Sequence, residues 1–336
     1  MPAVLEPVSV VIPMYNGAKY IQRVLDRVLS QRYTGRIEVI VVDDGSTDRS
    51  ADLVRPYVDS ERVKLLEQTN QGAASATNNG IRAAGNSIIC LVDSDVLLYP
   101  DWLARVMEEF QDPVVGAVQG YYKTPASISI WGRAMGYDIE KRYDDIRDKY
   151  VTQVCTGNTA YRQKALQEVG LFDEDFTYGY DNDMSYRLVR AGYRLVFRKD
   201  ALCDHYWKET LASYLKQQYH SAYGRMQLIS RYPDKKGGDS VSGLRMILQV
   251  PATLAALILI ISGAILFWSG KTAILLYGGV LLGLLVIIDR FLFSIGVFRK
   301  QHDPTAFLIP LVHLIRNIVW CWALAAWSLQ TRRKRA

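Results

Sequence analysis

Residues 246–268 form a long stretch of apolar and small side chains, broken by few polar residues such as Gln249. A helix of about 20 such residues crosses the hydrocarbon core of a bilayer, and core helices of soluble proteins are usually apolar on one face alone. A second stretch covers residues 272–289, and a third covers residues 306–329. We therefore expect a soluble domain at residues 1–240, followed by a helical membrane domain at residues 241–336.

The third stretch differs from the other two because it contains His313 and Arg316. A charged side chain at the centre of a bilayer is costly, so an interfacial or re-entrant helix is the alternative to a third span. Basic residues flank the stretches in three clusters: Arg225, Arg231, Lys235, Lys236 and Arg245; Arg299 and Lys300; and residues 332–335. The positive-inside rule places all three clusters in the cytoplasm, which two spans and an interfacial third helix satisfy. The prediction is an integral protein of a prokaryotic inner or plasma membrane with its first domain in the cytoplasm.

The basic character of the chain, a formal charge of +6, is concentrated beside the apolar stretches. Anionic lipid of the inner leaflet is the natural partner of such clusters, so a nucleic-acid partner is not expected. The four cysteines show no C-x-x-C spacing, which favours structural thiols over a metal or redox site. Self-association of the chain stays open.

Strand and helix patterns alternate through the first domain. Apolar, β-branched runs predict strands at 8–12, 37–42, 63–66 and 88–92, and helical spacing of apolar or small residues predicts helices at 18–30, 50–57 and 73–84. This alternation predicts an α/β fold with a mostly parallel, doubly wound sheet. Such sheets bind ligands at the carboxyl ends of their strands. Three polar segments come directly after strands and are expected at that edge: Asp43–Asp44, Asn70–Gly72 and Asp93–Asp95.

Asp93 and Asp95 lie two residues apart at the end of a strand that reads as fully buried. Two such carboxylates repel each other unless a hard divalent cation shares them, and that cation would also attract a diphosphate. A solvated acidic turn is the simpler alternative. Neither G-x-x-x-x-G-K-[ST] nor G-x-G-x-x-G occurs, so any bound nucleotide needs another device for its phosphates.

Five sequence blocks occur in an order that resembles family 2 glycosyltransferases, whose fold is called GT-A. They are "VSVVIPMYNGAKYIQRVLDRVLSQ", "EVIVVDDGSTDRS", "TNQGAASATNNGIRAAGNSIICLVDSDV", "CTGNTAYRQKALQEVGLFDEDF" and "YDNDMSYRLVRAGYRLV". The resemblance covers about residues 7–207. It implies a Rossmann-like, mostly parallel sheet flanked by helices, a nucleotide-sugar donor, Mn²⁺ or Mg²⁺, and inversion at the anomeric carbon.

The resemblance also implies roles for individual residues. Pro13, Tyr15 and Asp44 would hold uracil or another nucleobase. Asp95 would be the main metal ligand beside His205 and Asp93. The nucleotide-binding candidates are Pro13, Tyr15, Asn16, Asp43, Asp44, Asn70, Gly72, Asn78, Asp93 and Ser94. Without the resemblance, Tyr15 would be a core or rim aromatic, and residues 43–48 a turn with a helix cap.

Asp181 matches the catalytic base of the family, although Tyr180 stands where a glutamate is usual. A helix N-cap is the alternative role for Asp181, and Asp183 is expected to pair with Arg187 one helical turn later. Gly157, Asn158, Tyr180, Gln218 and Arg225 are the candidates for the acceptor or diphosphate region; a tight turn is the alternative for Gly157, and a basic helix facing lipid headgroups is the alternative for Gln218 and Arg225.

At two places the sequence departs from the family pattern, which limits the residue roles that can be inferred from the resemblance. Thr77 replaces a usual arginine before Asn78, and the Gln-x-x-Arg-Trp element of processive synthases is absent. The second departure argues for the addition of one sugar rather than a polymer. A charged, aromatic helix at 129–150 either borders the acceptor channel or is a solvated amphipathic helix.

Together these patterns predict a membrane-attached, metal-dependent, inverting glycosyltransferase. It would move one sugar, from a UDP-sugar by family inference, to a lipid or lipid-linked hydroxyl acceptor at the cytoplasmic face, as in glycolipid or cell-envelope polysaccharide synthesis. A polyprenyl-phosphate glycosyltransferase is the nearest alternative, although an ionised phosphate needs no base such as Asp181. A non-catalytic membrane scaffold that retains the GT-A fold is the alternative of a different class.

Overall fold

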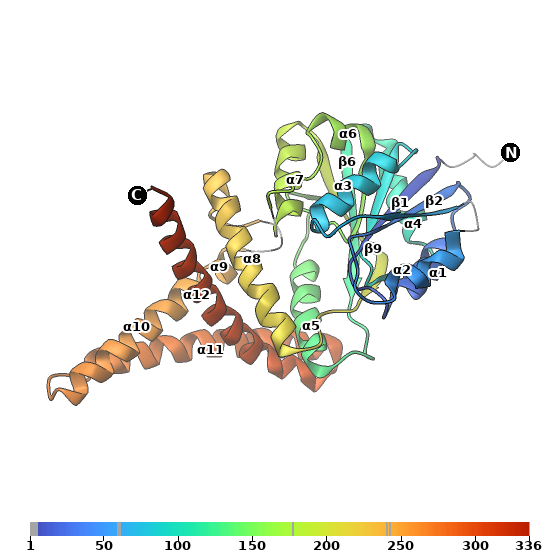
Figure 1. Cartoon of the computed structure of the whole chain (residues 1–336). Helices are drawn as coiled ribbons and strands as arrows, with labels where there is room; N and C mark the ends of the chain where they lie inside the picture. Colours follow the sequence, from blue (N-terminus) through green and yellow to red (C-terminus); the bar gives the residue numbers. More distant parts are fainter. Residues whose placement is uncertain (1–5, 59–61, 177, 240, 242, 336) are drawn as a thin grey trace. The chain divides into compact units, whose positions relative to one another are not determined.

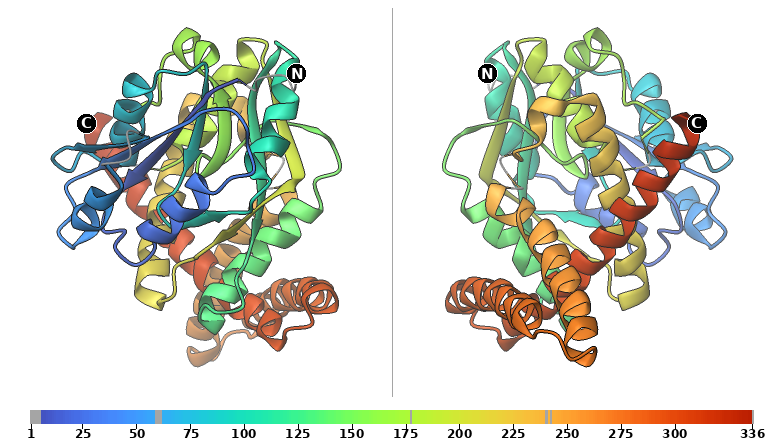
Figure 2. Two further views of the ribbon diagram at one scale, coloured as in Figure 1. Left: turned by 90° about the vertical axis from the view of Figure 1, so that its right-hand side faces the viewer. Right: turned by 90° about the vertical axis from the view of Figure 1, so that its left-hand side faces the viewer.

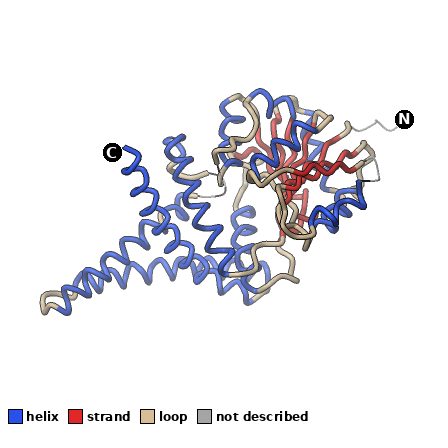
Figure 3. Tube along the Cα trace, viewed as in Figure 1, coloured by secondary structure: helices blue, strands red, loops and turns tan. Residues whose placement is uncertain are grey.

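The chain divides into two compact units, and the strands of the fold belong to the first (Figures 1 and 3). The structure is a computed structural model that describes residues 6–58, 62–176, 178–239, 241 and 243–335. The first unit comprises Met1–Pro125 and Ile146–Tyr206, and the second comprises Ala126–Asp145 and Trp207–Ala336. The second unit therefore takes one helix from the middle of the chain in addition to the C-terminal third.

One nine-stranded sheet organises the first unit, in the order β3-β2-β1-β4-β8-β6-β9-β5, with β7 pairing to β9. Its strands are β1 (Val8–Met14), β2 (Ile37–Asp43), β3 (Val63–Glu67), β4 (Ile88–Val92), β5 (Val96–Leu98), β6 (Val115–Lys123), β7 (Tyr150–Val151), β8 (Asn158–Arg162) and β9 (Arg194–His205). Its helices are α1 (Ile21–Leu29), α2 (Ser50–Val58), α3 (Ala73–Ala83), α4 (Trp102–Met107), α6 (Gln163–Glu168) and α7 (Tyr180–Arg190), with a 3₁₀ turn at Glu108–Gln111.

The first half of the sheet forms as the alternating pattern predicts. The central strands β1, β2 and β4 are buried along nearly their whole length because helices cover the sheet, and α1 buries Ile21, Val24, Leu25 and Val28 on a single stripe. β1, β2, β3 and β4 pair with one another in parallel, whereas β8 lies antiparallel between β4 and β6. The sheet is therefore mixed, with a parallel half that matches the expected fold class.

The order of the strands creates a switch point at β1. After β3 the chain crosses β2 and β1 and forms β4 on the other side of β1. Because the connections on the two sides of β1 run in opposite directions, a crevice is expected at the carboxyl ends of these strands. Met14 at the end of β1 is in register with Asp43 at the end of β2. Asp93 follows directly after Val92, the last residue of β4. The polar strand ends thus meet at one edge, as predicted.

The second unit is helical. It contains α5 (Ile130–Asp144), α8 (Leu211–Arg231), α9 (Leu244–Ile247), α10 (Gln249–Trp268), α11 (Ile274–Gln301) and α12 (Ile309–Arg335), with 3₁₀ turns at Pro233–Lys235 and Pro304–Leu308. Figure 1 shows α10 and α11 as a hairpin of two adjacent helices. Glycines permit this contact, because a β-carbon at Gly263 would lie 2.1 Å from the Leu276 nitrogen, and one at Gly279 would lie 2.7 Å from the Ile260 nitrogen.

Helix α5 packs among the C-terminal helices although its sequence lies between β6 and β7. Its Ala134, Met135 and Tyr137 share a buried cluster with Tyr214 of α8 and with side chains of α11 and α12: Val297, Ile309 and Val312. Figure 2 shows α12 running beside α8, and the Trp320 indole donates a hydrogen bond to Gln218 Oε1 at 3.2 Å. The helix expected at 129–150 is shorter than predicted, Ile130–Asp144, and its apolar face is buried by other helices of the second unit.

Three helices of the second unit are long and apolar enough to cross a membrane: Leu244–Trp268, Ile274–Gln301 and Pro304–Leu329. The second continues well beyond the expected end at residue 289. Arg316 in the third is 4% exposed and donates a 2.8 Å hydrogen bond to Gln249 Oε1, so the protein itself solvates the guanidinium. Whether the third helix spans or lies in the interface stays a prediction, as do the division at residue 240 and the orientation. The side chains of the basic cluster at 332–335 lie outside the described residues.

Candidate active site

The first wall of the site joins the ends of β1 and β2. The carboxylate of Asp43 accepts a hydrogen bond from the Ser46 backbone at 3.2 Å, and Ser46 Oγ accepts from the Asn16 N–H at 2.9 Å. Asn16, at φ 54°, accepts a hydrogen bond at its side-chain oxygen from the Thr47 N–H at 2.8 Å. These bonds clamp two loops together and leave Tyr15 52% exposed at the rim, next to Pro13 in the β1 ladder. An exposed aromatic ring on a rigid loop is suited to stack on a base.

Asp44 has a largely internal role. Its carboxylate accepts hydrogen bonds from the N–H groups of Gln71 and Gly72 at 2.8 and 2.9 Å, and from Gln68 Nε2 at 2.7 Å. Asn70 in turn donates to the Asp44 carbonyl at 3.0 Å. The predicted cluster of Asp44, Asn70 and Gly72 therefore exists, but its polar groups hold the loop before α3 in shape. Any contact from Asp44 to a base would have to compete with three donors from the protein.

Asp95 and His205 meet at the opposite wall. Val96 is in register with His205 across the antiparallel pair β5–β9, which brings Asp95 Oδ1 within 3.4 Å of His205 Nε2. Two atoms that each lie about 2.1 Å from one cation are separated by roughly this distance. Among the described residues no group of three or more His, Cys, Asp or Glu side chains gathers as a metal site. Asp93, the third expected ligand, is therefore not clustered with this pair.

Asp93 instead lies against Gly157. The Asp93 N–H donates to the Gly157 carbonyl at 3.1 Å, and a β-carbon at position 157 would lie 2.1 Å from Asp93 Oδ2. Glycine is thus required at 157 because a carboxylate occupies the space of a side chain. Ser94 faces the end of β1, with its hydroxyl 3.2 Å from where a β-carbon on Gly17 would stand. The three residues of the acidic motif consequently face different neighbours.

The charges of Asp181 and Asp93 both act on two tyrosines, the half-buried Tyr180 and the fully buried Tyr161. Asp181 is the second residue of α7, which follows Gly179 in a left-handed conformation at φ 84°. Burial raises the pKa of Tyr180 well above its ordinary value, and the negative charges of Asp93 and Asp181 raise it further. Burial and the charge of Asp181 likewise raise the pKa of Tyr161. Both hydroxyls therefore stay protonated and can donate hydrogen bonds at neutral pH.

Several predicted site residues have structural partners. Asn78 donates to the Phe172 carbonyl and to Glu174 Oε1, both at 2.8 Å, and accepts from the Phe172 N–H, so its amide secures a loop and is not available to a nucleotide. Asn158 is fully buried, and its oxygen accepts from the Trp102 indole at 2.7 Å. Asp183 is confirmed as the i,i+4 partner of Arg187, at 2.8 Å.

Gln218 and Arg225 belong to the second unit, on α8. Arg225 donates to Asp239 at 3.2 Å and to the Lys235 carbonyl at 3.0 Å, and Gln218 accepts from Trp320. These contacts give both residues a role within the helical unit, so their expected part in the diphosphate region stays a prediction.

Tyr161 is the residue that the sequence did not single out. It lies on β8, is completely buried, and its hydroxyl has no hydrogen-bond partner among the described residues. The strand pattern "NTAYR" could have suggested an inward-facing tyrosine. Its nearness to Asp181 depends on the packing of α7 against the sheet, which no local pattern encodes.

Comparison with known proteins identifies the class. The model of the glycosyl transferase family 2 domain matches residues 9–170. Glycosyltransferase AglE from Haloferax volcanii is 30% identical over 239 residues, which are 68% of this chain and 76% of that protein. Poly-beta-1,6-N-acetyl-D-glucosamine synthase from Staphylococcus aureus is 27% identical over 68% of this chain; the matched region is 56% of the length of that relative.

A solved structure shares the fold. Mannosyltransferase PcManGT from Pyrobaculum calidifontis, solved in complex with GDP-Man and Mn²⁺, aligns with 96% of this chain and 88% of its own at a TM-score of 0.62. The sequence identity of 20% makes this a likeness of fold. Since the alignment covers 96% of this chain, it includes the C-terminal helices. The GT-A architecture that the resemblance implied is confirmed.

Proposed function

This chain belongs to glycosyl transferase family 2 and is a glycosyltransferase, and we propose that it transfers one sugar, with inversion, from a UDP-sugar to a hydroxyl group of a lipid-linked acceptor. The single observation that carries the reaction type is the 3.4 Å approach of Asp95 to His205 at the end of β5 and β9. Asp93 and Asp181 form a separate acidic group around Tyr180. Such a site separates a place for the diphosphate from a base for the acceptor.

Asp95 and His205 are the proposed protein ligands of a divalent cation. Their 3.4 Å separation fits two ligands of one ion. The imidazole favours Mn²⁺ over Mg²⁺, which prefers oxygen ligands. When bound, the cation stabilises the negative charge of the departing diphosphate. The Mn²⁺ and GDP-Man of the Pyrobaculum structure support a nucleotide sugar and a divalent metal in general.

Asp181 is the proposed general base. In an inverting displacement the acceptor hydroxyl attacks the anomeric carbon and must lose its proton as the bond forms, and a carboxylate within hydrogen-bond reach accepts it. Tyr180 and Tyr161 remain protonated, and the negative charges of Asp93 and Asp181 act on both. Asp93 is fixed against Gly157 and is the proposed contact to the ribose or the donor sugar.

The three apolar helices support an acceptor that resides in a membrane. A lipid-linked acceptor reaches an enzyme by lateral diffusion when the enzyme shares its bilayer. We place the catalytic domain of residues 1–240 at the cytoplasmic face of a prokaryotic membrane, where the basic clusters are favoured by the positive-inside rule. The absence of Gln-x-x-Arg-Trp in the sequence supports a single transfer.

A donor screen tests this proposal. Purified full-length protein is incubated with Mn²⁺, a lipid extract and one of UDP-glucose, UDP-galactose, UDP-N-acetylglucosamine or GDP-mannose, and nucleotide release is measured. We expect nucleotide release with a UDP-sugar that requires both metal and lipid. EDTA should abolish this release. Release with GDP-mannose alone would refute the uridine assignment, and transfer to an added polyprenyl phosphate alone would replace the hydroxyl acceptor.

A further inference from the structure

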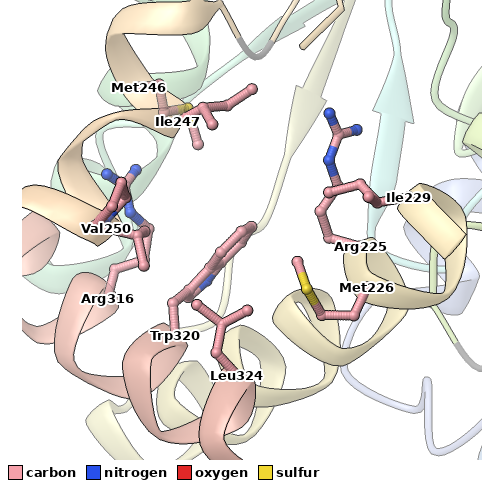
Figure 4. A pocket seen from close by; sticks show the side chains of 10 residues that line it. Arg225, Met226, Ile229, Met246, Ile247, Val250, Arg316, Trp320 and Leu324 are labelled. Carbon is pink, nitrogen blue, oxygen red and sulfur yellow. The ribbon is translucent and has the colours of Figure 1, made fainter. Parts of the chain in front are cut away.

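Arginine side chains fix the packing of both units. In the second unit, Arg225 and Arg316 lie on the wall of an apolar cavity between α8, the α9–α10 segment and α12 (Figure 4). Arg225 pairs with Asp239 at 3.2 Å, and Arg316 donates to Gln249 at 2.8 Å while the negative charge of Asp138 acts on it. These contacts join parts of the helical unit to one another. In the first unit, by contrast, one arginine contact lies directly beside the proposed metal pair.

Arg23 of α1 contacts Tyr206, the residue that follows His205. Its Nη2 donates a hydrogen bond to the Tyr206 hydroxyl at 2.7 Å, and its guanidinium carbon lies 5.0 Å from the centre of the Tyr206 ring. The same ring packs against Tyr20, with the two ring centres 4.4 Å apart, and Tyr206 is only 8% exposed. A hydrogen bond from a charged donor is stronger than a neutral one, and the cation–π contact adds to it. Tyr206 is therefore anchored to a helix that lies 183 residues earlier in the chain.

Tyr206 also joins the two proposed metal ligands through its backbone. Its N–H donates to the Asp95 carbonyl at 3.0 Å, and the adjoining pair in the β5–β9 ladder is Val96 with His205. The imidazole of His205 lies against the Tyr122 ring, with 5.0 Å between the ring centres. The 3.4 Å separation of Asp95 Oδ1 and His205 Nε2 therefore depends on the position of this end of β9.

This end of β9 is also where the chain leaves the first unit. His205 is the last residue of the strand, Tyr206 is the last residue of the unit, and Trp207 belongs to the second unit. The partner strand β5 has three residues, so few ladder bonds hold this edge of the sheet. Strand ends of this kind open at little cost in free energy unless other contacts hold them.

We propose that Arg23 and Tyr206 are positioning residues for the Asp95–His205 pair, and that their contact holds the ends of β5 and β9 at the spacing that one divalent cation requires. The role rests on the proposed metal site, because the contact is assigned to the ligands of that site. Arg23 acts by packing and hydrogen bonding rather than by charge, since a positive charge on α1 opposes the binding of another cation.

Hydrogen exchange in the metal-free, full-length protein tests the anchoring. Arg23→Met removes both of its contacts with Tyr206, and Tyr206→Phe removes the hydroxyl while it keeps the ring. We expect the amides of residues 94–98 and 203–207 to exchange about ten-fold faster in Arg23→Met, with a smaller increase in Tyr206→Phe. Tyr57→Phe removes a hydroxyl bond to Asp26 of the same helix, at 2.9 Å, and should leave both segments unchanged. Wild-type exchange in Arg23→Met and Tyr206→Phe would overturn the proposal, whether or not the protein binds metal.

Mn²⁺ binding tests the effect on the metal pair, and the EPR signal of the free ion measures it during titration of the full-length protein. Charge alone predicts that Arg23→Met binds Mn²⁺ more tightly, whereas lost positioning predicts weaker binding. We expect binding about ten-fold weaker, the lower end of the range for residues that orient metal ligands, and weaker binding in the neutral change Tyr206→Phe as well.

Arg27→Met is the matched control for charge. Arg27 lies one turn further along α1, and its charge acts on Asp204, next to His205, as that of Arg23 does. This variant should bind Mn²⁺ no more weakly than the wild type. Unchanged or tighter binding in Arg23→Met would overturn the positioning role alone. A wild-type protein that binds no Mn²⁺ would overturn the metal site itself, and with it the role of Arg23 and Tyr206.

Discussion

Gly157 and Asp93 occupy each other's space: a β-carbon on Gly157 would lie 2.1 Å from Asp93 Oδ2. The same two residues are joined by a backbone hydrogen bond of 3.1 Å at the point where β4 ends and β8 begins. The position of one acidic side chain is therefore fixed by the lack of a side chain on the neighbouring strand. This relationship connects a sheet register with the geometry of the proposed donor site.

Gly157→Ala should impair catalysis far more than stability. The methyl group would displace the Asp93 carboxylate, and a misplacement of about 1 Å can cost on the order of 10² in rate. We expect kcat/KM for the donor to fall about 100-fold with a small change in unfolding temperature. Gly85→Ala is the control, because a β-carbon there would meet nothing closer than 3.8 Å. Equal activity of the two variants would contradict a functional role for the Asp93 position.

Asp95→Asn and His205→Ala should weaken metal activation together. If both side chains bind one cation, each loss should raise the Mn²⁺ concentration for half-maximal activity at least ten-fold, since even indirect partners of a metal contribute 10- to 100-fold. Titration of Mn²⁺ into EDTA-treated protein, followed by nucleotide release, measures the effect. Asp101→Asn, an exposed residue after β5, should titrate like the wild type. Unchanged metal activation in both variants would remove the pair from the proposed metal site.

Asp183→Asn should lower stability rather than turnover per folded molecule. Asp183 is fully buried and binds Arg187, whose guanidinium also donates to the carbonyls of Val169 and Leu171 at 2.8 and 3.0 Å. Breaking a buried pair of this kind costs about 3 kcal/mol. Chemical denaturation compares the variant with Asp148→Asn, which alters an exposed carboxyl. A loss of activity without a loss of stability would instead place Asp183 in the reaction.

Glu38 should give a pH-dependent contribution to stability. Burial opposes its ionisation, but hydrogen bonds from Lys64 at 2.6 Å, Ser9 at 2.6 Å and the Gly85 N–H at 3.0 Å outweigh burial and hold the pKa of Glu38 below its ordinary value near 4.5. A carboxyl whose pKa is lower in the folded state stabilises the fold above its unfolded pKa, and this stabilisation is lost as pH falls through the folded pKa.

Glu38→Gln should therefore lower stability by about 1–2 kcal/mol at pH 7, with a difference that shrinks below about pH 4. Unfolding midpoints measured from pH 3 to pH 8 test the sign. Glu67→Gln, an exposed partner of Arg55 on the neighbouring strand, is the control and should show little change across this range. A difference that grows toward low pH would mean that the ionised carboxylate does not stabilise the fold.

The sequence patterns predicted the first half of the sheet because its strands are short apolar runs that alternate with helical stripes. The strand over 88–92 has the predicted bounds, and Asp43 and Asp93 reach one edge because parallel strands share their carboxyl ends. The antiparallel insertion of β8 between β4 and β6 could not be predicted in this way. Its place depends on pairing between segments far apart in the chain, which periodicity does not specify.

Individual polar residues were harder to predict than elements. Asn78 was predicted to contact a nucleotide, yet both polar atoms of its amide form hydrogen bonds with the 172–174 segment. The helix expected at 129–150 was predicted to border an acceptor channel or to be a solvated amphipathic helix, and the apolar face of α5 is buried by α8, α11 and α12. Local sequence determines which face of a helix is apolar, whereas the partner that covers this face is determined by tertiary packing.

Transfer of radiolabel from a UDP-sugar into the organic phase of a lipid extract tests the central claim most directly. Wild-type protein should label lipid in Mn²⁺ and not in EDTA. Asp181→Asn should lose about 10²–10⁴ in rate while it still binds UDP and metal by calorimetry, and Asp175→Asn, an exposed change in the loop before α7, should transfer normally. Undiminished transfer by Asp181→Asn, or no lipid labelling by the wild type with any donor, would contradict the account.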